Sequence, residues 1–270
     1  MKKINIIILI AIAMFFLASC KTLTVPELAL DKEAYIASDV FVLYFPYTYK
    51  GNAYKISNPR LKKGFRPIAD YVTWHNERMD NDLRDMRSAH FDGVFLCLTP
   101  MDMADKNKRE MIAHFLEKCS QLQFKVVFCL FSDTPIALGL ENVVNYIQDR
   151  QWDKSPSVYV IDGKIPLVFN ESITLSVKGD NTMFTPLYLD IANSIFTQPL
   201  PCPFDIAKST NSPETILADR TKATILVKSI NDAVERHSRR ILVLSWNYYA
   251  NGSAIEKNTF DYDTQLKALQ

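Results

Sequence analysis

The chain has 270 residues, of which 48% are hydrophobic and 23% are charged, and its net charge at pH 7 is +1. This balance leaves no basic footprint for DNA or RNA, so we expect no nucleic-acid partner. The roughly 250 residues that follow the first 20 suit one large domain, a size common among barrels.

The first residues predict export. Lys2 and Lys3 precede an apolar run at 4–16, and residues 17–20 read Leu-Ala-Ser-Cys, which matches a bacterial lipoprotein processing box. The run is shorter than the about 20 residues that a bilayer span needs. We therefore expect lipid modification of Cys20. An ordinary secretory signal with a chance cysteine is the alternative.

On this interpretation residues 1–19 are a lipoprotein signal peptide and residues 20–35 are a lipidated tether. Lys21, rather than an aspartate, follows the cysteine. We therefore expect a cell-envelope protein that is anchored through Cys20 in the membrane, and the outer membrane of a Gram-negative bacterium in particular. The sequence leaves the leaflet open.

Four more cysteines lie in the mature chain: Cys97, Cys119, Cys129 and Cys202. Cys97 and Cys129 sit inside apolar runs, where cysteine usually acts as a small core residue. No two of the four have zinc-like spacing. A disulfide is possible in an exported protein, but the sequence does not pair the sulfurs.

Short apolar runs alternate with amphipathic segments along the rest of the chain. The runs predict strands at 39–47, 91–98, 124–133, 159–161, 165–171 and 240–249. The segments predict helices at 78–90, 106–123, 140–151, 213–237 and 261–270. In the first helix Met79, Leu83 and Met86 share one face, which we expect to be buried.

Apolar strands separated by helices indicate a parallel sheet whose outer face the helices cover. No glycine-rich phosphate loop follows the first strand, which weighs against a nucleotide-binding doubly wound sheet. Polar and aromatic residues gather where the strands end, as in a (β/α)8 TIM barrel with its site at the C-terminal face. We therefore predict an α/β TIM barrel over 36–270. Its strands five to seven are expected to be irregular, because 172–212 holds only short apolar pieces.

Four stretches carry a family pattern in order: VLYFPY at 42–47, FDGVF at 91–95, YVIDGKIPLVF at 159–169 and WNYYANG at 246–252. They resemble segments of the endo-α-mannosidase-like glycoside hydrolases of families 99 and 71. Ile255-Glu256 and Tyr262 extend the last match. The resemblance covers most of 40–270 and implies a TIM barrel that acts on or binds a polysaccharide or another glycan.

The last motif departs from the family at the positions that matter most. The resemblance places the family's two acid–base glutamates at Tyr248 and Asn251. Glycoside hydrolysis normally needs two carboxyl groups that flank the bond. Tyrosine titrates near pH 10 and asparagine does not titrate, so neither replaces a carboxyl group at pH 7. The inherited mechanism is therefore expected to be absent.

Aromatic and amide side chains near this motif are candidates for sugar binding. Trp246, Tyr248 and Tyr249 could pack against a pyranose face, while Asn247 and Asn251 could bond its hydroxyls. Strand alternation sends Trp246 and Tyr248 to one side and Asn247 and Tyr249 to the other, so not all of them can line one pocket. Filling of the barrel mouth by one or two of the rings is the alternative.

Two further residues near the first strand and the first helix complete the candidates for ligand contact. Tyr47, at the end of the first strand, is a further candidate for sugar binding. His75, just before the first helix, could reach the mouth, although single histidines more often pack or face solvent.

Acids near other strand ends are candidates for a relocated catalytic pair. We favour Glu256, which alone falls on an acidic motif position, together with Glu171 and Asp102. Asp133 and Asp205 are further acids of this kind, and Asp133 also suits a helix N-cap. Each of these acids could equally be a solvated loop carboxylate.

Three functions stay open: an enzyme with relocated acids, a pseudoenzyme that binds glycan, and a structural or protein-binding envelope lipoprotein. No cofactor is expected and no metal is implied, although a carboxylate-rich mouth could hold calcium. The sequence does not give the sugar, the linkage or the oligomeric state.

Overall fold

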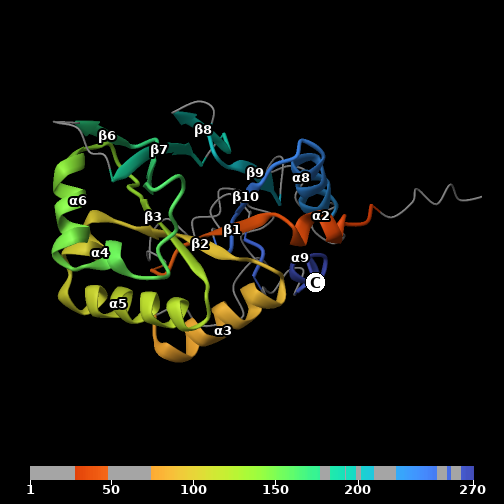
Figure 1. Ribbon diagram of the computed structural model, residues 1–270, viewed down its shortest axis with the longest axis horizontal. Helices are drawn as coiled ribbons and strands as arrows, with labels where there is room; N and C mark the ends of the chain where they lie inside the picture. Colours follow the sequence, from red (N-terminus) through yellow and green to blue (C-terminus); the bar gives the residue numbers. More distant parts are fainter. Residues whose placement is uncertain are drawn as a thin grey trace, which may run out of the picture.

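The computed structural model describes residues 28–47, 74–176, 183–191, 193–198, 202–209, 223–247, 254–256 and 263–270. In this part eight strands form one sheet in the order β8-β7-β5-β3-β2-β1-β10-β9. The strands are β1 Asp39–Tyr44, β2 Gly93–Leu98, β3 Lys125–Leu130, β5 Ile165–Asn170, β7 Phe184–Asp190, β8 Ile195–Gln198, β9 Asp205–Lys208 and β10 Arg240–Leu244. The sheet curves into a nearly closed TIM-like barrel (Figure 1), as the strand and helix pattern predicts.

Neighbouring strands run parallel except at one edge, where β8 turns back against β7. This reversal lies in the stretch where irregular strands are expected. The edge strands β8 and β9 are bridged by side chains, because the rings of Phe196 and Phe204 stack with their centres 6.2 Å apart. Among the described residues, packing rather than strand pairing therefore closes the barrel.

Helices cover the outside of one half of the barrel. Figure 1 shows α3 and α5 below the sheet in the view, α6 at one flank and α2, α8 and α9 at the other. The helices are α2 Lys32–Ile36, α3 Asn76–Ser88, α4 Pro100–Ala104, α5 Lys106–Gln121, α6 Leu140–Asp149, α8 Thr224–Glu235 and α9 Thr264–Lys267, with a 3-10 turn η1 at Trp152–Lys154. Within the described ranges, no helix is long and apolar enough to cross a membrane.

The alternation of β1 separates two clusters of buried side chains. Phe41, Leu43 and Phe45 belong to an inner cluster that fills the bore of the barrel. Val40, Val42 and Tyr44 belong to an outer cluster between sheet and helices. Met79, Leu83 and Met86 join this outer cluster, so the predicted buried face of α3 is confirmed.

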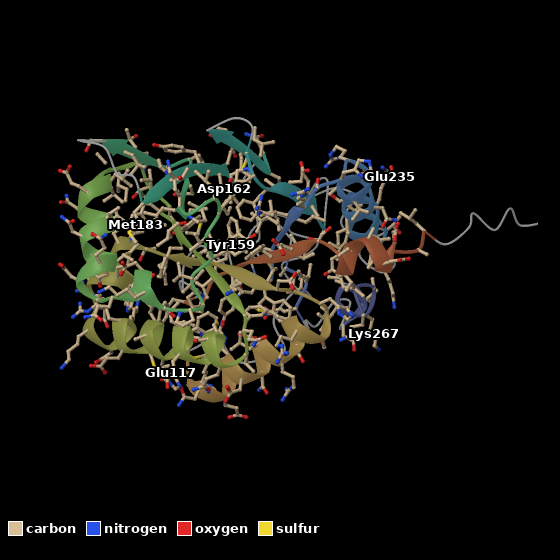
Figure 2. All side chains as sticks on the ribbon, in the orientation of Figure 1. Glu117, Tyr159, Asp162, Met183, Glu235 and Lys267 are labelled. Carbon is tan, nitrogen blue, oxygen red and sulfur yellow. The ribbon has the colours of Figure 1, made fainter. Side chains whose placement is uncertain are left out.

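Most charged side chains lie at the periphery, although Arg78, Asp82, Asp102 and Glu256 are buried. Figure 2 shows Glu117, Glu235 and Lys267 pointing away from the core.

Two element predictions need correction, and one small sheet was not predicted. Residues 159–161 form no strand: Val158 makes an isolated bridge to Val126 of β3 and Ile161 one to Lys164, because the chain turns at once into β5. Asp133 does not cap a helix, since β4 Ile136–Gly139 follows it and α6 begins only at Leu140. β4 pairs with β6 Ile173–Ser176 as a separate two-stranded parallel sheet, which the sequence did not indicate.

Two other predictions are tested only in part. The long predicted helix is described only from residue 224, as α8, and the closing helix only as α9.

Candidate functional site

Parallel strands end at the same edge of a sheet, so the residues that follow β1, β2, β3, β5 and β10 meet at one rim. We call this the C-terminal rim. It brings together most of the candidates: Tyr47, Asp102, Glu171, Trp246, Asn247 and Glu256. Tyr248, Tyr249 and Asn251, as well as Cys20, lie outside the described residues.

Two asparagines at the rim hold neighbouring strands together. Asn247 accepts a hydrogen bond from the backbone N–H of Phe45 (2.9 Å) and donates one to its carbonyl (2.8 Å). Asn170 makes the same pair of bonds with Ser132, at 3.0 and 2.9 Å. Each amide continues the strand ladder by one step, from β10 to β1 and from β5 to β3. Both asparagines are buried, so their amide groups serve the backbone rather than an open cleft.

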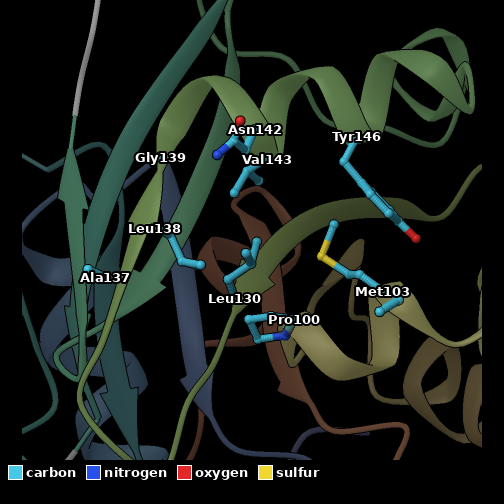
Figure 3. Close-up of a pocket in the computed structure, with 10 residues that line it drawn as sticks. Pro100, Met103, Leu130, Ala137, Leu138, Gly139, Asn142, Val143 and Tyr146 are labelled. Atoms are coloured by element: carbon cyan, nitrogen blue, oxygen red, sulfur yellow. The ribbon is translucent and has the colours of Figure 1, made fainter.

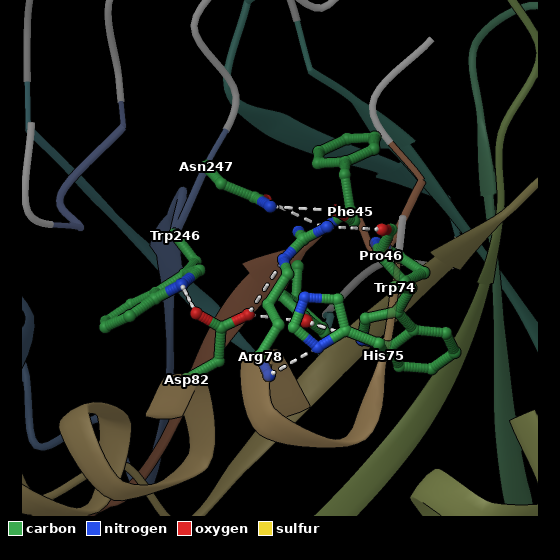
Figure 4. A network of polar contacts seen from close by, with 9 residues as sticks. Phe45, Pro46, Trp74, His75, Arg78, Asp82, Trp246 and Asn247 are labelled. Carbon is green, nitrogen blue, oxygen red and sulfur yellow. Dashed lines mark hydrogen bonds and ion pairs between the residues drawn. The ribbon is translucent and has the colours of Figure 1, made fainter. Parts of the chain in front are cut away.

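A buried polar network lies beneath the rim, around Asp82 of α3 (Figure 4). The Tyr44 hydroxyl donates to Asp82 at 2.7 Å, and the Trp246 ring nitrogen donates to its other oxygen at 3.4 Å. Arg78 lies 3.5 Å from the same carboxylate and donates to the carbonyl of Pro46 at 3.0 Å. The network thus ties α3 to the ends of β1 and β10.

The charges in this network oppose one another. Burial raises the pKa of Asp82, while Arg78 and the hydrogen bonds from Tyr44 and Trp246 lower it. Burial also raises the pKa of Tyr44 well above its usual value, and Asp82 adds to that shift. Arg78 and Asp82 were not among the candidates predicted from the sequence. Their spacing of one helical turn, beside the apolar stripe of α3, is the sequence signal for this ion pair.

Trp246 is a core residue in this structure. It is 1% exposed and packs in the outer cluster, edge-to-face with Phe91. Its neighbour Asn247 turns instead to the backbone of Phe45, so the two residues do lie on different sides. The geometry favours the core-filling alternative for the Trp246 ring, and ligand contact by either residue stays a prediction.

Tyr47 is half-buried at the rim. Its ring stands edge-on to Trp74, with centres 5.4 Å apart, and the Lys108 ammonium lies 4.5 Å above it. Its hydroxyl is buried and has no hydrogen-bond partner among the described residues. Burial raises its pKa, and Asp102 and Asp105 raise it further. One face of the ring is therefore taken by Lys108.

Asp102 is held by local structure. Its carboxylate accepts from the backbone N–H and hydroxyl of Thr99, in a capping box that starts α4. Lys108 contacts its other oxygen at 2.6 Å. The carboxylate is buried, and its contacts are those of a helix cap.

The other two favoured acids lie in different surroundings. Glu171 is exposed and accepts from the backbone N–H of Ile191 at 3.2 Å, which joins the ends of β5 and β7. Glu256 is 4% exposed, and burial raises its pKa well above the usual value.

Of the two remaining acids, Asp133 is exposed shortly after β3, whereas Asp205 sits in a structural position, as does the histidine. Asp205 begins β9 at the opposite edge of the sheet, where it bonds Ser238, so it is not at the rim. His75 caps α3 and accepts from the N–H of Arg78 at 3.3 Å.

Apolar side chains fill the centre of the rim. Phe45 and Phe131 meet edge-to-face with their ring centres 5.3 Å apart, and Ile191 joins the same inner cluster. All three are buried. Among the described residues, the bore therefore ends in an apolar floor rather than in a pair of facing carboxylates.

An apolar pocket of about 260 Å³ opens beside the rim, on the outer side of β3 (Figure 3). Met103, Leu130, Leu138, Val143 and Tyr146 are among the residues that line it. The pocket was not predicted, because β4, whose Leu138 lines one side of it, has no clear signal in the sequence. A second hollow, of about 360 Å³, lies at the other end of the strands. The described ranges contain no group of three or more metal-binding side chains.

No protein-family model and no curated protein matches the sequence. Solved structures do match the fold. The chain is similar to the family 99 endo-α-mannosidase from Bacteroides thetaiotaomicron in complex with bis-tris propane, with 13% identity, a TM-score of 0.58, and coverage of 86% of this chain and 95% of that one. Another structure of the family 99 endo-α-mannosidase from this bacterium matches with 14% identity and a TM-score of 0.55, and the match covers 85% of this chain and 95% of that one. The fold implied by the motif resemblance is therefore confirmed, and at such identities the likeness shows the fold alone.

Proposed function

We propose that the chain is a cell-envelope lipoprotein whose glycoside hydrolase-like barrel binds a glycan without hydrolysing it. One observation supports the loss of hydrolysis: the three favoured acids at the rim are engaged in the fold or buried. Asp102 caps α4, Glu171 bonds the backbone of Ile191, and Glu256 is 4% exposed. A hydrolase needs two carboxyl groups about 5–10 Å apart across an open cleft.

The ligand class follows from the fold and the motif. The solved structures with the same fold are described as endo-α-mannosidases, so α-linked mannan is the first candidate and α-glucan the second. Tyr248, Tyr249 and Asn251 follow the buried Trp246 and Asn247 directly, and they stay the predicted ligand contacts. Aromatic rings with amide groups suit a pyranose ring and its hydroxyls.

Titration calorimetry of the chain from residue 21 onward, with α-mannan and α-glucan fragments, tests this function. We expect saturable heat and no new reducing ends. Continuous heat with new reducing ends would show turnover and overturn the proposal. The double variant Tyr248→Ala/Tyr249→Ala should weaken binding at least tenfold, and because the two rings are expected on opposite sides, one of the single variants should account for most of that loss. Tyr188→Ala is the control, because Tyr188 lies on β7, outside the motif, and should leave affinity unchanged.

Attachment to the envelope is tested separately. We expect lipid on Cys20 and recovery of the full chain in the membrane fraction. Cys20→Ser should remove both the lipid and the membrane association. Labelling with a radioactive fatty acid, followed by fractionation, measures both. Label that persists in the variant would contradict the assignment of Cys20.

A protein-binding scaffold is the second candidate, and the apolar floor of Phe45, Phe131 and Ile191 favours it. A filled bore leaves less room for a buried sugar than an open one. Absence of heat with every glycan tested would favour the protein-binding scaffold over the glycan-binding barrel.

A further inference from the structure

Two cysteines face each other inside the bore. Cys97 on β2 and Cys129 on β3 are direct register partners in the parallel pair. Both belong to the inner cluster, so both side chains point to the same side of the sheet. Neighbouring strands lie about 4.8 Å apart, which falls within the 4.4–6.8 Å between Cα atoms that a disulfide spans.

Both thiols are free and buried in this structure, and Cys129 lies close enough to Cys97 to help raise the pKa of its thiol. Cys97 donates a hydrogen bond to the carbonyl of Phe95 at 3.6 Å. We propose that Cys97 and Cys129 form a disulfide between adjacent strands when the chain folds in the presence of a disulfide oxidant. The pairing follows from register and side-chain direction and does not depend on the glycan-binding function.

The other two described cysteines are worse partners. Cys119 lies on α5 and packs in the outer cluster, on the opposite side of the sheet from the pair. Cys202 touches the inner cluster from a different end of the strands. Two residues after it, Phe204 packs on Phe41 and Phe95 near the start of the bore.

The bond must form before the bore closes. Cys97 is 4% exposed and Cys129 is fully buried, so a dissolved oxidant cannot reach them in the folded barrel. Burial also raises the pKa of the Cys97 thiol well above its usual value, which keeps it protonated and unreactive. Once formed, the bond is shielded from reductants in the same way.

An organic disulfide such as oxidised glutathione can serve as the oxidant. One cysteine thiolate attacks the glutathione disulfide and releases one glutathione thiolate. The second cysteine thiolate then attacks the mixed disulfide and releases the other. The two protein thiols lose two protons and two electrons, and the oxidant is reduced to two thiols.

The test uses the full chain in detergent, reduced and unfolded in urea and then refolded with a glutathione redox buffer. Free thiols are blocked with N-ethylmaleimide in urea, and a tryptic digest is mapped without reduction. We expect a cross-linked peptide that joins Cys97 and Cys129. The cross-link should persist in Cys119→Ser and Cys202→Ser and vanish in Cys97→Ser.

Both thiols blocked by maleimide in the refolded chain, or either one linked to Cys202, would overturn the proposal. If the chain does not refold from urea, it is instead synthesised in a cell-free system that contains oxidised glutathione. Presence or absence of the cross-linked Cys97–Cys129 peptide then tests the proposal in the same way. The melting temperature of the oxidised chain should exceed that of the reduced chain by about 5–10 °C, because the bond constrains the unfolded state.

Discussion

The side-chain amide of Asn247 pairs with the backbone of Phe45 as a strand would, accepting from its N–H at 2.9 Å and donating to its carbonyl at 2.8 Å. Asn247 is fully buried. Removal of the amide would strip two buried backbone groups of these bonds, at about 1–3 kcal/mol each. We expect Asn247→Ala to lower the free energy of unfolding by roughly 2 to 4 kcal/mol, as measured by urea denaturation.

Two other asparagines serve as controls for this prediction. Asn170→Ala should cost a similar amount, because Asn170 makes the same pair of bonds with Ser132. Asn142 is exposed on α6, and its change to alanine should alter stability by less than about 0.5 kcal/mol. A stable Asn247→Ala protein that no longer bound glycan would instead identify Asn247 as a ligand residue.

The barrel could be predicted from the sequence because the patterns that indicate its strands and helices are local. Apolar runs and amphipathic segments alternate, and the buried stripe of Met79, Leu83 and Met86 follows helical spacing. The two-stranded sheet of β4 and β6 was not accessible, because its strands are four residues each and only half-buried. Short strands of this kind have too few residues to show a period.

The candidate site was harder to predict, because a side chain's role depends on its partners. Sequence places Trp246 and Asn247 at the end of the last strand, and the structure agrees. Only the folded chain shows that Trp246 bonds Asp82 and that Asn247 bonds Phe45. These contacts join residues that are far apart in the sequence, so no local sequence pattern predicts them.

Asp102 should matter for stability rather than for turnover. Its carboxylate accepts two bonds from Thr99 and contacts Lys108 at 2.6 Å while buried. We expect Asp102→Ala to destabilise the fold by about 1–3 kcal/mol through loss of the cap and of this ion pair. Urea denaturation of the variant and of the parent chain measures the difference.

An exposed ion pair of the same length provides the control. Asp80 contacts Lys118 at 2.6 Å, but the Asp80 side chain is 58% exposed. Asp80→Ala should therefore cost less than about 1 kcal/mol. Loss of glycan hydrolysis in Asp102→Ala without loss of stability would point to a catalytic role for Asp102.

Glu256 should make stability fall as pH rises. Burial raises its pKa well above the usual value, so the folded chain keeps this proton at pH values where the unfolded chain has lost it. Above the unfolded-state pKa of about 4.3, the folded state therefore binds more protons, and stability is lost up to the folded-state pKa. Glu256→Gln should match the parent near pH 4 and be more stable at neutral pH.

Urea denaturation between pH 4 and pH 8 tests this sign. Glu117→Gln is the control, because the Glu117 side chain is 66% exposed. Its difference from the parent should change little over this range. A Glu256→Gln protein less stable than the parent at pH 7 would mean that the ionised form of Glu256 is favourably held.

Gly93, in the FDGVF stretch, is expected to be irreplaceable for a steric reason. A Cβ atom there would overlap the backbone carbonyl of Lys125 on β3 and lie 2.7 Å from a ring carbon of Phe41. The carbonyl belongs to the neighbouring strand, so relief requires β2 and β3 to separate. We expect Gly93→Ala to destabilise the fold by about 2–3 kcal/mol. Gly163→Ala is the matched control: a Cβ there meets nothing within 4 Å, and the φ of +77° alone should cost about 1 kcal/mol. Urea denaturation measures the free energy of unfolding of both variants. Equal losses of stability in the two would show that the close approach of β2 and β3 is not the reason why position 93 requires glycine.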